Sequence, residues 1–417
     1  MSTAAAPTPL PTSAPSPGPA RPLPRRRGAF ALQASVLIAL LAASSAPTPL
    51  YAIYQAEWHF SALTVTIVFS AYALALLAAL LVAGSLSDYV GRRPVLVVSL
   101  LAEAAAMAAF AGAHGVGWLI AARIVQGLAT GAATAAAGAA LLDFEHPGRP
   151  GRAALANSAT PVAGMAAGVL VSTALVQFAP APTRTVYLLL IALFAAQAAA
   201  VALTPETADP HPGGWRSLRP GIAVAPSARR TLLVAAPAVI AAWALGGFYS
   251  SLGPSLARTI APTAPRATGG LLFFAMALGA AVTVVATRPL RAHVVGTAGT
   301  AALIPGALLT LSSPHLHSLP VLFVGTMVSG AGFGAVSQGT IRRLLPLTTP
   351  EERAGTLAAY YVVSYLAMSV PAILAGVLTS RYGLTTAVSL YAGAVVLLVL
   401  ATLAVLPLNT RRCGTAS

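Results

Sequence analysis

Two ionisable side chains lie inside long apolar stretches of this sequence, where charge is costly. Glu103 lies in the run that begins at Pro94, and Arg123 lies in the run that follows. An intramembrane carboxyl group can carry a proton reversibly, and it can also pair with a cation on a neighbouring helix. The sequence leaves both roles open for Glu103, a proton carrier or a structural partner of Arg123.

A short polar segment between two apolar runs carries a second group of charges. Its distinctive residues are Gly84, Asp88, Gly91, Arg92 and Arg93. Gly84 would let two helices approach closely, and Gly91 would permit a sharp turn. Asp88 can cap a helix N-terminus or pair with Arg92. The flanking runs are each near the roughly 20 residues of a membrane-spanning helix.

Composition places the whole chain in a bilayer. Of 417 residues, 57% are hydrophobic and 8% are charged, and the mean hydropathy is +0.81. Soluble domains have about 25% charged residues, so this chain cannot cover a globule with polar surface. Soluble enzymes and nucleic-acid binders are excluded despite the net charge of +15. All basic residues are Arg, and without Lys there is no P-loop for an ATP-driven pump.

Twelve apolar runs predict an all-α membrane protein with twelve transmembrane helices. The runs cover about 29–50, 63–84, 94–113, 116–140, 153–176, 184–203, 229–252, 267–287, 292–311, 319–341, 354–379 and 384–406. A Pro-rich polar segment separates the sixth from the seventh, which predicts two six-helix halves. The predicted organisation is a disordered cytoplasmic tail, two halves, a linker between them and a second tail, at 1–28, 29–203, 204–228, 229–408 and 409–417.

The distribution of arginine predicts the orientation. With both termini inside the cell, the predicted cytoplasmic segments hold 19 of the 24 basic residues and the outer loops hold 4, and Arg123 is left within a span. An excess of Arg in cytoplasmic loops is the positive-inside rule. The chain is therefore expected to be a multi-pass protein of the plasma or inner membrane.

The polar segment from Gly84 to Pro94 closely resembles the signature loop of the major facilitator superfamily of secondary transporters. A second signature of that family is similar to the stretch containing Arg123, Gln126, Gly127 and Gly131. The two glycines, four residues apart, favour close helix packing. For Arg123, a side chain reaching the outer interface is the alternative to a buried one.

The fifth apolar run partly resembles the signature of drug and metabolite exporters in the same family. Pro161 and Gly164 match it, whereas Thr160 and Met165 stand where the exporters have glycine. Proline and glycine are also common in membrane helices without any such role. The resemblance therefore implies an exporter-like antiporter, and the departures leave ordinary helix packing open.

In this family helices 1, 4, 7 and 10 line the cavity, which implicates Arg123, Gln126, Trp243 and Gln338 in the substrate path. Other aromatic side chains, Tyr51, Tyr54 and Tyr249, are expected to belong to interfacial belts. The mostly apolar cavity favours a lipophilic or weakly polar solute. The leading function is thus proton-coupled export of a small organic molecule by a monomer that needs no cofactor or metal. Transport of a sugar-like solute and a non-transporting receptor or assembly role remain as alternatives.

Overall fold

The computed structural model is helical throughout, as the apolar runs predict. It describes residues 23–210, 212–213, 218 and 222–413, and over these residues twelve helices are long and apolar enough to cross a membrane. A helix satisfies its backbone hydrogen bonds internally, which the hydrocarbon core of a bilayer requires. The predicted class, an all-α protein with twelve transmembrane helices, is confirmed.

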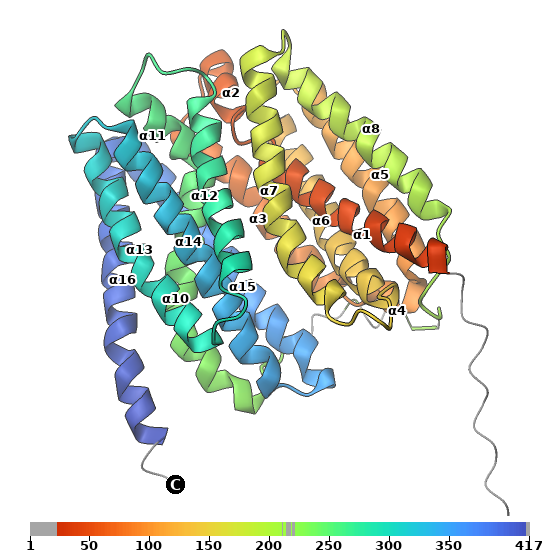
Figure 1. Ribbon diagram of the computed structural model, residues 1–417. Coiled ribbons are helices and arrows are strands. Elements are labelled where there is room, and N and C mark those ends of the chain that lie inside the picture. Colours follow the sequence, from red (N-terminus) through yellow and green to blue (C-terminus); the bar gives the residue numbers. More distant parts are fainter. Residues whose placement is uncertain (1–22, 211, 214–217, 219–221, 414–417) are drawn as a thin grey trace, which may run out of the picture.

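The helices form two bundles that lie side by side (Figure 1). The first bundle contains α1 (Leu23–Ser45), α2 (Tyr51–Trp58), α3 (Ala62–Ala83), α4 (Leu86–Val90), α5 (Arg92–Ala111), α6 (Val116–Asp143), α7 (Arg152–Phe178) and α8 (Pro182–Ala202). The second contains α10 (Pro226–Ser251), α11 (Gly253–Ile260), α12 (Thr268–Ala286), α13 (Ala292–His315), α14 (Leu319–Leu344), η1 (Leu345–Leu347), α15 (Pro350–Tyr382) and α16 (Leu384–Cys413).

The first span of each bundle breaks and continues as a short helix. Helices α2 and α11 have eight residues each, and they follow α1 and α10 respectively. Pro47 and Pro49 stand in the first break, and Pro254 stands on the first turn of α11, just after the second break. Proline has no N–H to donate and disfavours a helical residue before it. Turn hydrogen bonds such as Leu50 N–H to Pro47 O, 3.0 Å, satisfy the backbone across the first break.

Polar residues at the helix starts fix several boundaries. The Ser61 side chain accepts the backbone N–H of Thr64 at 3.2 Å and so caps α3. Thr349 and Glu352 form a capping box at the start of α15, in which each side chain meets the other residue's backbone. Such caps satisfy N–H groups that have no partner within the helix.

Each bundle has its own hydrophobic core, and the bundles touch most extensively along two helix pairs. Helix α15 packs against α3, and α12 packs against α7. At the first contact Ser70 donates a hydrogen bond to the Ser369 carbonyl at 3.3 Å. At the second, Val169 of α7 belongs to the core cluster of the second bundle.

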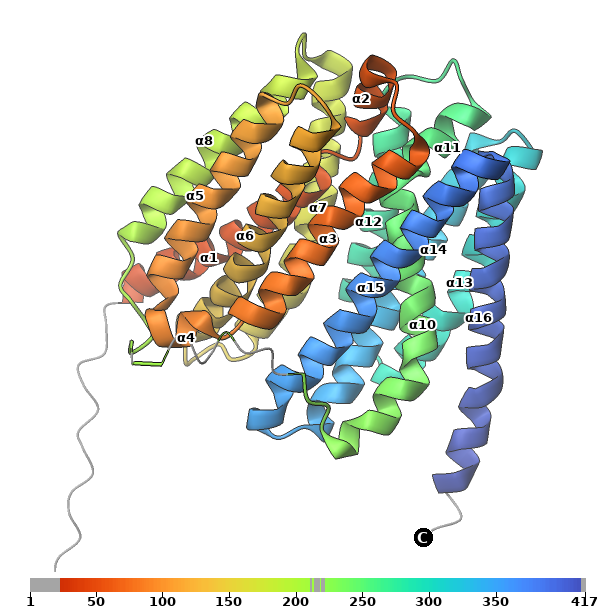
Figure 2. The same cartoon turned by 180° about the vertical axis from the view of Figure 1, so that it is seen from behind.

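The bundles converge at the end that carries α2 and α11 and separate toward α4 and the start of α15 (Figures 1 and 2). At the converging end, Ser255 donates to the Gln55 side chain at 3.4 Å, and Arg258 donates to the Ala52 carbonyl at 3.5 Å. The molecule is therefore drawn together at one end.

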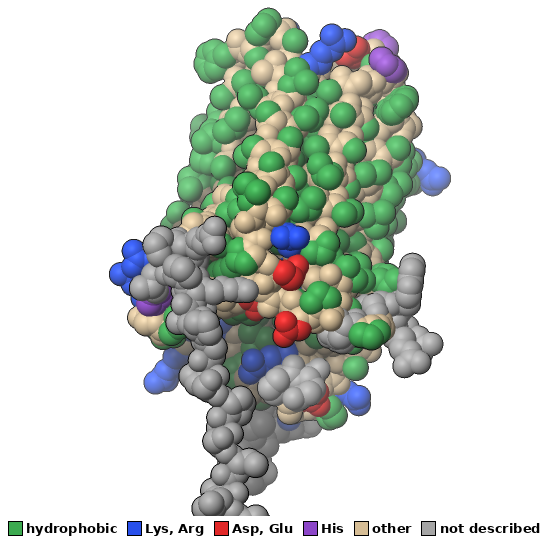
Figure 3. Space-filling model, turned by 90° about the vertical axis from the view of Figure 1, so that its right-hand side faces the viewer, with side chains coloured by type: hydrophobic (Ala, Val, Ile, Leu, Met, Phe, Trp, Pro, Cys, Tyr) green, Lys and Arg blue, Asp and Glu red, His purple; other side chains and the backbone are tan. Residues whose placement is uncertain are grey.

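The surface of the spans is apolar. Figure 3 shows hydrophobic side chains over the middle of one flank of the first bundle, with arginine and acidic side chains near its two ends. Val98 on α5 and Leu188 on α8 are 67% and 58% exposed. Side chains of this kind need lipid around them, since exposed leucine and valine on this scale would aggregate in water.

Several helix ends differ from the apolar runs. Helix α1 begins at Leu23, inside the segment 1–28 that the sequence predicts as a tail, and it already ends at Ser45. Helix α16 continues to Cys413, through most of the predicted tail 409–417. Hydropathy does not mark these ends because arginine and leucine are both good helix formers. The remaining tail residues, 1–22 and 414–417, lie outside the described residues.

Candidate functional site

The loop between α3 and α5 is built around Arg92. Its guanidinium donates to the Asp88 carboxylate, to the Ser87 hydroxyl at 2.8 Å and to Asp143 Oδ2 at 3.3 Å. Gly91 has a φ of +110°, a conformation that side chains rarely adopt, and the chain turns there into α5. The arginine thus ties the α3–α5 loop to the end of α6.

Glu206 occupies the N-terminus of α5. Its carboxylate accepts the backbone N–H groups of Arg92 at 2.8 Å and Arg93 at 3.0 Å, and also those of Thr207 and Ala208. Burial raises the pKa of Glu206, but the N–H donors outweigh it and hold the pKa below its ordinary value. Negative charge is favourable at a helix N-terminus.

The remaining members of the signature loop complete this junction. Gly84 is the C-cap of α3, and Arg93 donates from Nη1 to the Thr204 carbonyl at 3.5 Å. Thr207 donates to Asp143 Oδ2 at 2.7 Å. One polar network therefore links α4, the start of α5, the end of α6 and the segment after α8, at the end where the bundles separate.

Arg123 is fully buried within the first bundle rather than at an interface. Its guanidinium donates twice to the Tyr51 hydroxyl, at 2.9 and 2.5 Å, once to the Ser44 carbonyl at 3.0 Å and once to Gln126 Oε1 at 2.9 Å. The rings of Tyr51, Tyr72 and Phe110 lie 5.6, 5.1 and 5.8 Å from it. Cation–π contacts and hydrogen bonds to neutral groups together hold this charge.

Glu103 does not pair with Arg123. Arg92 forms ion pairs with Asp88 and Asp143, and no ion pair joins Glu103 to Arg123 in the described part of the chain. Glu103, which is 0% exposed, accepts a hydrogen bond of 2.5 Å from Thr130, and its other carboxylate oxygen has no described partner. Of the two roles that the sequence leaves open for Glu103, direct pairing with Arg123 is not seen in the structure, because Thr130 on α6 holds the carboxylate instead.

One face of α6 carries the polar side chains that connect these residues. Arg123, Gln126, Thr130 and Thr134 follow one another at helical spacing. Gln126 is 0% exposed, and its Nε2, like the Thr134 hydroxyl, has no hydrogen-bond partner among the described residues. Thr130 and Thr134 continue the spacing of Arg123 and Gln126 in the sequence. This spacing could have indicated a polar face of α6, but the prediction rested on the charged residues and Gln126 alone.

The predicted packing residues lie at close helix contacts. A Cβ on Gly127 would meet Tyr72 O and Ala75, and one on Gly131 would meet Ala79, so both glycines let α6 approach α3. On α7, Gly164 lies against the backbone of Ile38 on α1. Pro161 lies within α7, one turn before Gly164.

The second bundle offers aromatic rings instead of charges. Trp243 on α10 packs 5.2 Å from the rings of Phe333 on α14 and Tyr365 on α15, measured between centroids. Tyr361 lies 6.2 Å from Tyr365 on the same side. The buried Trp243 Nε1 and Ser337 hydroxyl make no hydrogen bond of normal geometry among the described residues, and both lie near the Tyr360 hydroxyl. Since α15 packs on α3, Tyr365 lies near Tyr72 of the first bundle.

Gln338 has a different setting from its neighbour Ser337. Its Oε1 accepts from the Thr287 hydroxyl at 3.0 Å, and its Nε2 donates to the Val284 carbonyl at 3.0 Å. Both partners lie at the end of α12, so Gln338 joins α14 to α12 and keeps no polar atom for a cavity. Phe333 and Ser337 are the residues of α14 that lie with Trp243.

The tyrosines expected in interfacial belts are buried. Tyr51 bonds Arg123, Tyr54 donates to the Tyr187 hydroxyl at 3.3 Å, and Tyr249 shares a hydrogen bond of 2.5 Å with Thr310. The prediction of interfacial belts was therefore wrong for these three residues. Each side chain bonds a buried partner inside the protein, and hydropathy does not reveal such a contact. Among the described residues, no group of acids, histidines and cysteines could hold a metal ion.

Twelve spanning helices in two bundles, with buried polar groups between and within them, define a membrane transporter fold. A family model of the major facilitator superfamily matches residues 34–290, and the chain belongs to that superfamily. It is therefore a multi-pass membrane protein and a secondary transporter, not an enzyme. A search of the curated proteins found no match.

Solved structures share this fold at low sequence identity. The human organic anion transporter MFSD10 (TETRAN) is 17% identical with a TM-score of 0.67, over 90% of this chain and 99% of that one. The nucleoside transporter NupG is 12% identical with a TM-score of 0.69, over 90% and 98%. A bacterial homologue of the lysosomal transporter Spinster, in an inward-facing unoccupied conformation, is 13% identical with a TM-score of 0.69, over 92% and 95%.

Proposed function

We propose that this transporter exports a lipophilic or weakly polar organic molecule in exchange for protons. Glu103 carries the proposal, because a buried carboxylate oxygen without a described partner is a site where a proton can bind and leave. Arg123 and Gln126 lie on the same face of α6 and would respond to the charge of Glu103 across Thr130. The coupling step is then a change of protonation within the first bundle.

The aromatic cluster supports the class of solute. Trp243, Phe333 and Tyr365 present ring faces, and Trp243 Nε1 and the Ser337 hydroxyl add two polar atoms. Between residues 229 and 408 the acids are Glu351 and Glu352, which stand at the start of α15 and not within a span. A site with rings and few polar groups suits a largely apolar ligand that makes one or two hydrogen bonds.

Export is supported by the partial exporter signature on α7. Gly164 lets α7 lie against the backbone of α1, and Gly168 does the same one turn further. A rigid contact of this kind suits a bundle that moves as one body during alternating access. The proposed orientation has both termini, α4 and the start of α15 on the cytoplasmic side of the plasma or inner membrane, which the excess of arginine in these segments supports, and the protein acts as a monomer.

A sugar-like solute is the alternative cargo, since aromatic rings and hydroxyl groups also suit sugars. The relatives named above carry an organic anion and a nucleoside, and the likeness to them concerns the fold. A receptor that transports no solute would not need Glu103 to bind and release a proton.

Transport into inverted vesicles tests the proposal. With an acidic lumen, a compound that is exchanged for protons should discharge the pH gradient, which a fluorescent pH indicator reports. Weakly polar aromatic compounds should do so and simple sugars should not. Discharge by sugars alone would establish the alternative cargo. Uptake of a labelled compound that ignores the pH gradient would refute proton coupling, and no response across the panel in vesicles that contain folded protein would favour a receptor.

A further inference from the structure

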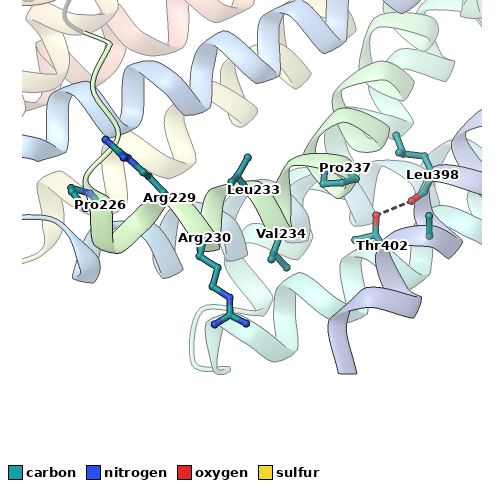
Figure 4. Close-up of a pocket in the computed structure, with 9 residues that line it drawn as sticks. Pro226, Arg229, Arg230, Leu233, Val234, Pro237, Leu398 and Thr402 are labelled. Atoms are coloured by element: carbon teal, nitrogen blue, oxygen red, sulfur yellow. Dashed lines mark hydrogen bonds between the residues drawn. The ribbon is translucent and has the colours of Figure 1, made fainter. Parts of the chain in front are cut away.

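A hollow of about 600 Å³ lies between α10 and α16, away from the aromatic cluster and the polar face of α6. The residues that line it are Pro226, Arg229, Arg230, Leu233, Val234, Pro237, Leu398, Ala401 and Thr402 (Figure 4). All of them belong to these two helices. Volumes of 300–1,000 Å³ are typical of sites for small ligands.

The hollow lies on the lipid-facing side of the second bundle. Helix α16 packs against α10, α13 and α15, all in its own bundle, and stands at the edge of the molecule farthest from the first bundle (Figures 1 and 2). Leu233 is 73% exposed although it lies two turns inside a spanning helix. An apolar surface of this kind is covered by hydrocarbon when the protein is in a bilayer.

Two arginines stand where the hollow reaches the end of the span. Arg229 and Arg230 lie near the start of α10 and point away from each other, and Leu398 and Thr402 lie on α16 beside Pro237, further along the span (Figure 4). The Arg229 guanidinium is held near this end, because its Nε donates to the Val224 carbonyl at 3.2 Å. The hollow is therefore apolar along the spans and cationic at the membrane surface.

A smaller polar hollow adjoins the first and adds a third cation. It shares Val234 and Thr402 with the larger hollow, and its other lining residues include Thr297, Thr340 and Arg343. Arg343 is half-buried on α14. Arg229 and Arg230 thus line the larger hollow and Arg343 the smaller one, all three near the same end of the second bundle.

We propose that this hollow binds one anionic phospholipid of the adjacent leaflet. An acyl chain lies between α10 and α16 against Leu233 and Leu398, and the phosphate lies at the level of Arg229 and Arg230. Basic pockets between transmembrane helices recognise anionic headgroups in this way, and arginine binds phosphate through parallel N–H donors. A zwitterionic lipid would gain the apolar contacts but little from the net charge, so the site distinguishes lipids by headgroup.

Native mass spectrometry of the purified protein with mixed phosphatidylglycerol and phosphatidylcholine tests the site. The wild type should retain one phosphatidylglycerol at detergent concentrations that remove the other lipids. The variant R229Q/R230Q should bind it about 25-fold more weakly, since each interfacial arginine strengthens binding to an anionic lipid about fivefold. The variant R229K/R230K keeps the charge and should retain most of the binding.

The matched control is R288Q/R291Q, which removes two exposed arginines between α12 and α13 that do not line the hollow. It should retain phosphatidylglycerol as the wild type does. Leu233→Trp, which fills the hollow and leaves both arginines in place, should lower the retention of either lipid. Equal retention of the two lipids by the wild type, an equal loss in the control, or unchanged retention in Leu233→Trp would overturn the proposal, as would a dimer mass in place of the bound lipid.

Discussion

Thr130 donates a hydrogen bond of 2.5 Å to Glu103, and this contact joins α6 to α5 in the interior of the first bundle. Glu103 keeps one oxygen without a described partner, and Arg123 lies two turns away on the α6 face that carries Thr130. A carboxylate paired directly with an arginine would resist protonation, because the ion pair favours the charged form. A carboxylate held by a hydroxyl group can accept a proton and remain in place.

Replacing Glu103 by Gln should abolish transport driven by a pH gradient, at least about tenfold below the wild type, while exchange of solute across the membrane persists. Gln has nearly the same shape and accepts the Thr130 hydrogen bond, but it cannot bind and release a proton. Gradient-driven uptake and solute exchange are measured on the same vesicles. Normal pH-dependent transport by a well-expressed Glu103→Gln protein would remove Glu103 from the mechanism.

Thr130→Val is the companion substitution. It keeps the volume of the side chain and removes the donor, so it leaves the carboxylate oxygen unsatisfied at a cost of about 1–3 kcal/mol. We expect transport with an altered pH profile and a lower unfolding temperature. A profile identical to that of the wild type would mean that Thr130 has a structural role only.

Trp243→Ala should weaken solute binding about 10- to 30-fold, as the loss of a central aromatic contact does in other sites. Gln338→Ala is the matched control. Gln338 also lies on α14, near the aromatic cluster, but both polar atoms of its side chain form hydrogen bonds with residues at the end of α12. It should affect folding yield more than affinity. Binding is measured by quenching of protein fluorescence, and a larger loss of affinity in Gln338→Ala than in Trp243→Ala would contradict this assignment.

The sequence was sufficient to predict the class of fold because apolar runs of bilayer length are a physical requirement. It also pointed to Arg123 and Glu103, since charge within such runs is rare and costly. It could not predict which hydroxyl group holds Glu103, because Thr130 is one of many threonines and its role depends on how α5 meets α6. Gln338 and Ser337 are adjacent in sequence, and only the rotation of α14 decides which of them lies with Trp243.

The role of Glu206 could not be predicted from the sequence for a similar reason. In the sequence it follows the sixth apolar run as an isolated acid. Its four backbone N–H partners include two from α5, more than 110 residues earlier in the chain. A sequence pattern over a few residues cannot predict a contact between residues so far apart in the chain. The signature loop was readily identified because all of its residues are close together in the sequence.

Glu206 should make the stability of the protein depend on acidic pH. Its pKa is lowered in the folded protein, so its stabilising contribution is fully present above its ordinary value near 4.5 and is lost as the pH falls through the lowered folded value. The unfolding temperature of Glu206→Gln in detergent should fall less than that of the wild type between pH 5 and pH 3. Glu57→Gln, which removes an exposed acid at the other end of the molecule, is the control and should follow the wild type.

The distribution of arginine predicts that the segment between α8 and α10 is cytoplasmic. In a Cys413→Ser background the chain has no other cysteine. Pro210→Cys should then resist an impermeant thiol reagent in intact cells and react after permeabilisation. Ala181→Cys, exposed in the loop between α7 and α8, should react in intact cells. The reverse pattern would invert the predicted topology.

Asp88 is expected to stabilise the state in which the predicted cytoplasmic ends of the bundles meet. In this structure Asp88 pairs with Arg92, its side chain is 50% exposed, and the start of α15 is capped by its own Thr349 and Glu352. When the predicted cytoplasmic ends close, Asp88 can dock near the N-terminus of α15, where the helix dipole favours negative charge. A partly solvated contact of this kind contributes about 1 kcal/mol, which is about fivefold in population.

Asp88→Asn should therefore keep the fold and solute binding, shift the population toward the form with separated cytoplasmic ends and slow turnover several-fold. Spin labels at Arg149→Cys in the first bundle and Leu347→Cys in the second, in the Cys413→Ser background, measure the separation of those ends by electron paramagnetic resonance. Asp143→Asn is the control, because it also removes a partner of Arg92 but lies on α6 and has no role on α15. If Asp88→Asn leaves both the distance distribution and the transport rate unchanged, the loop between α3 and α5 acts as a structural hairpin and the proposed contact with α15 does not regulate the switch.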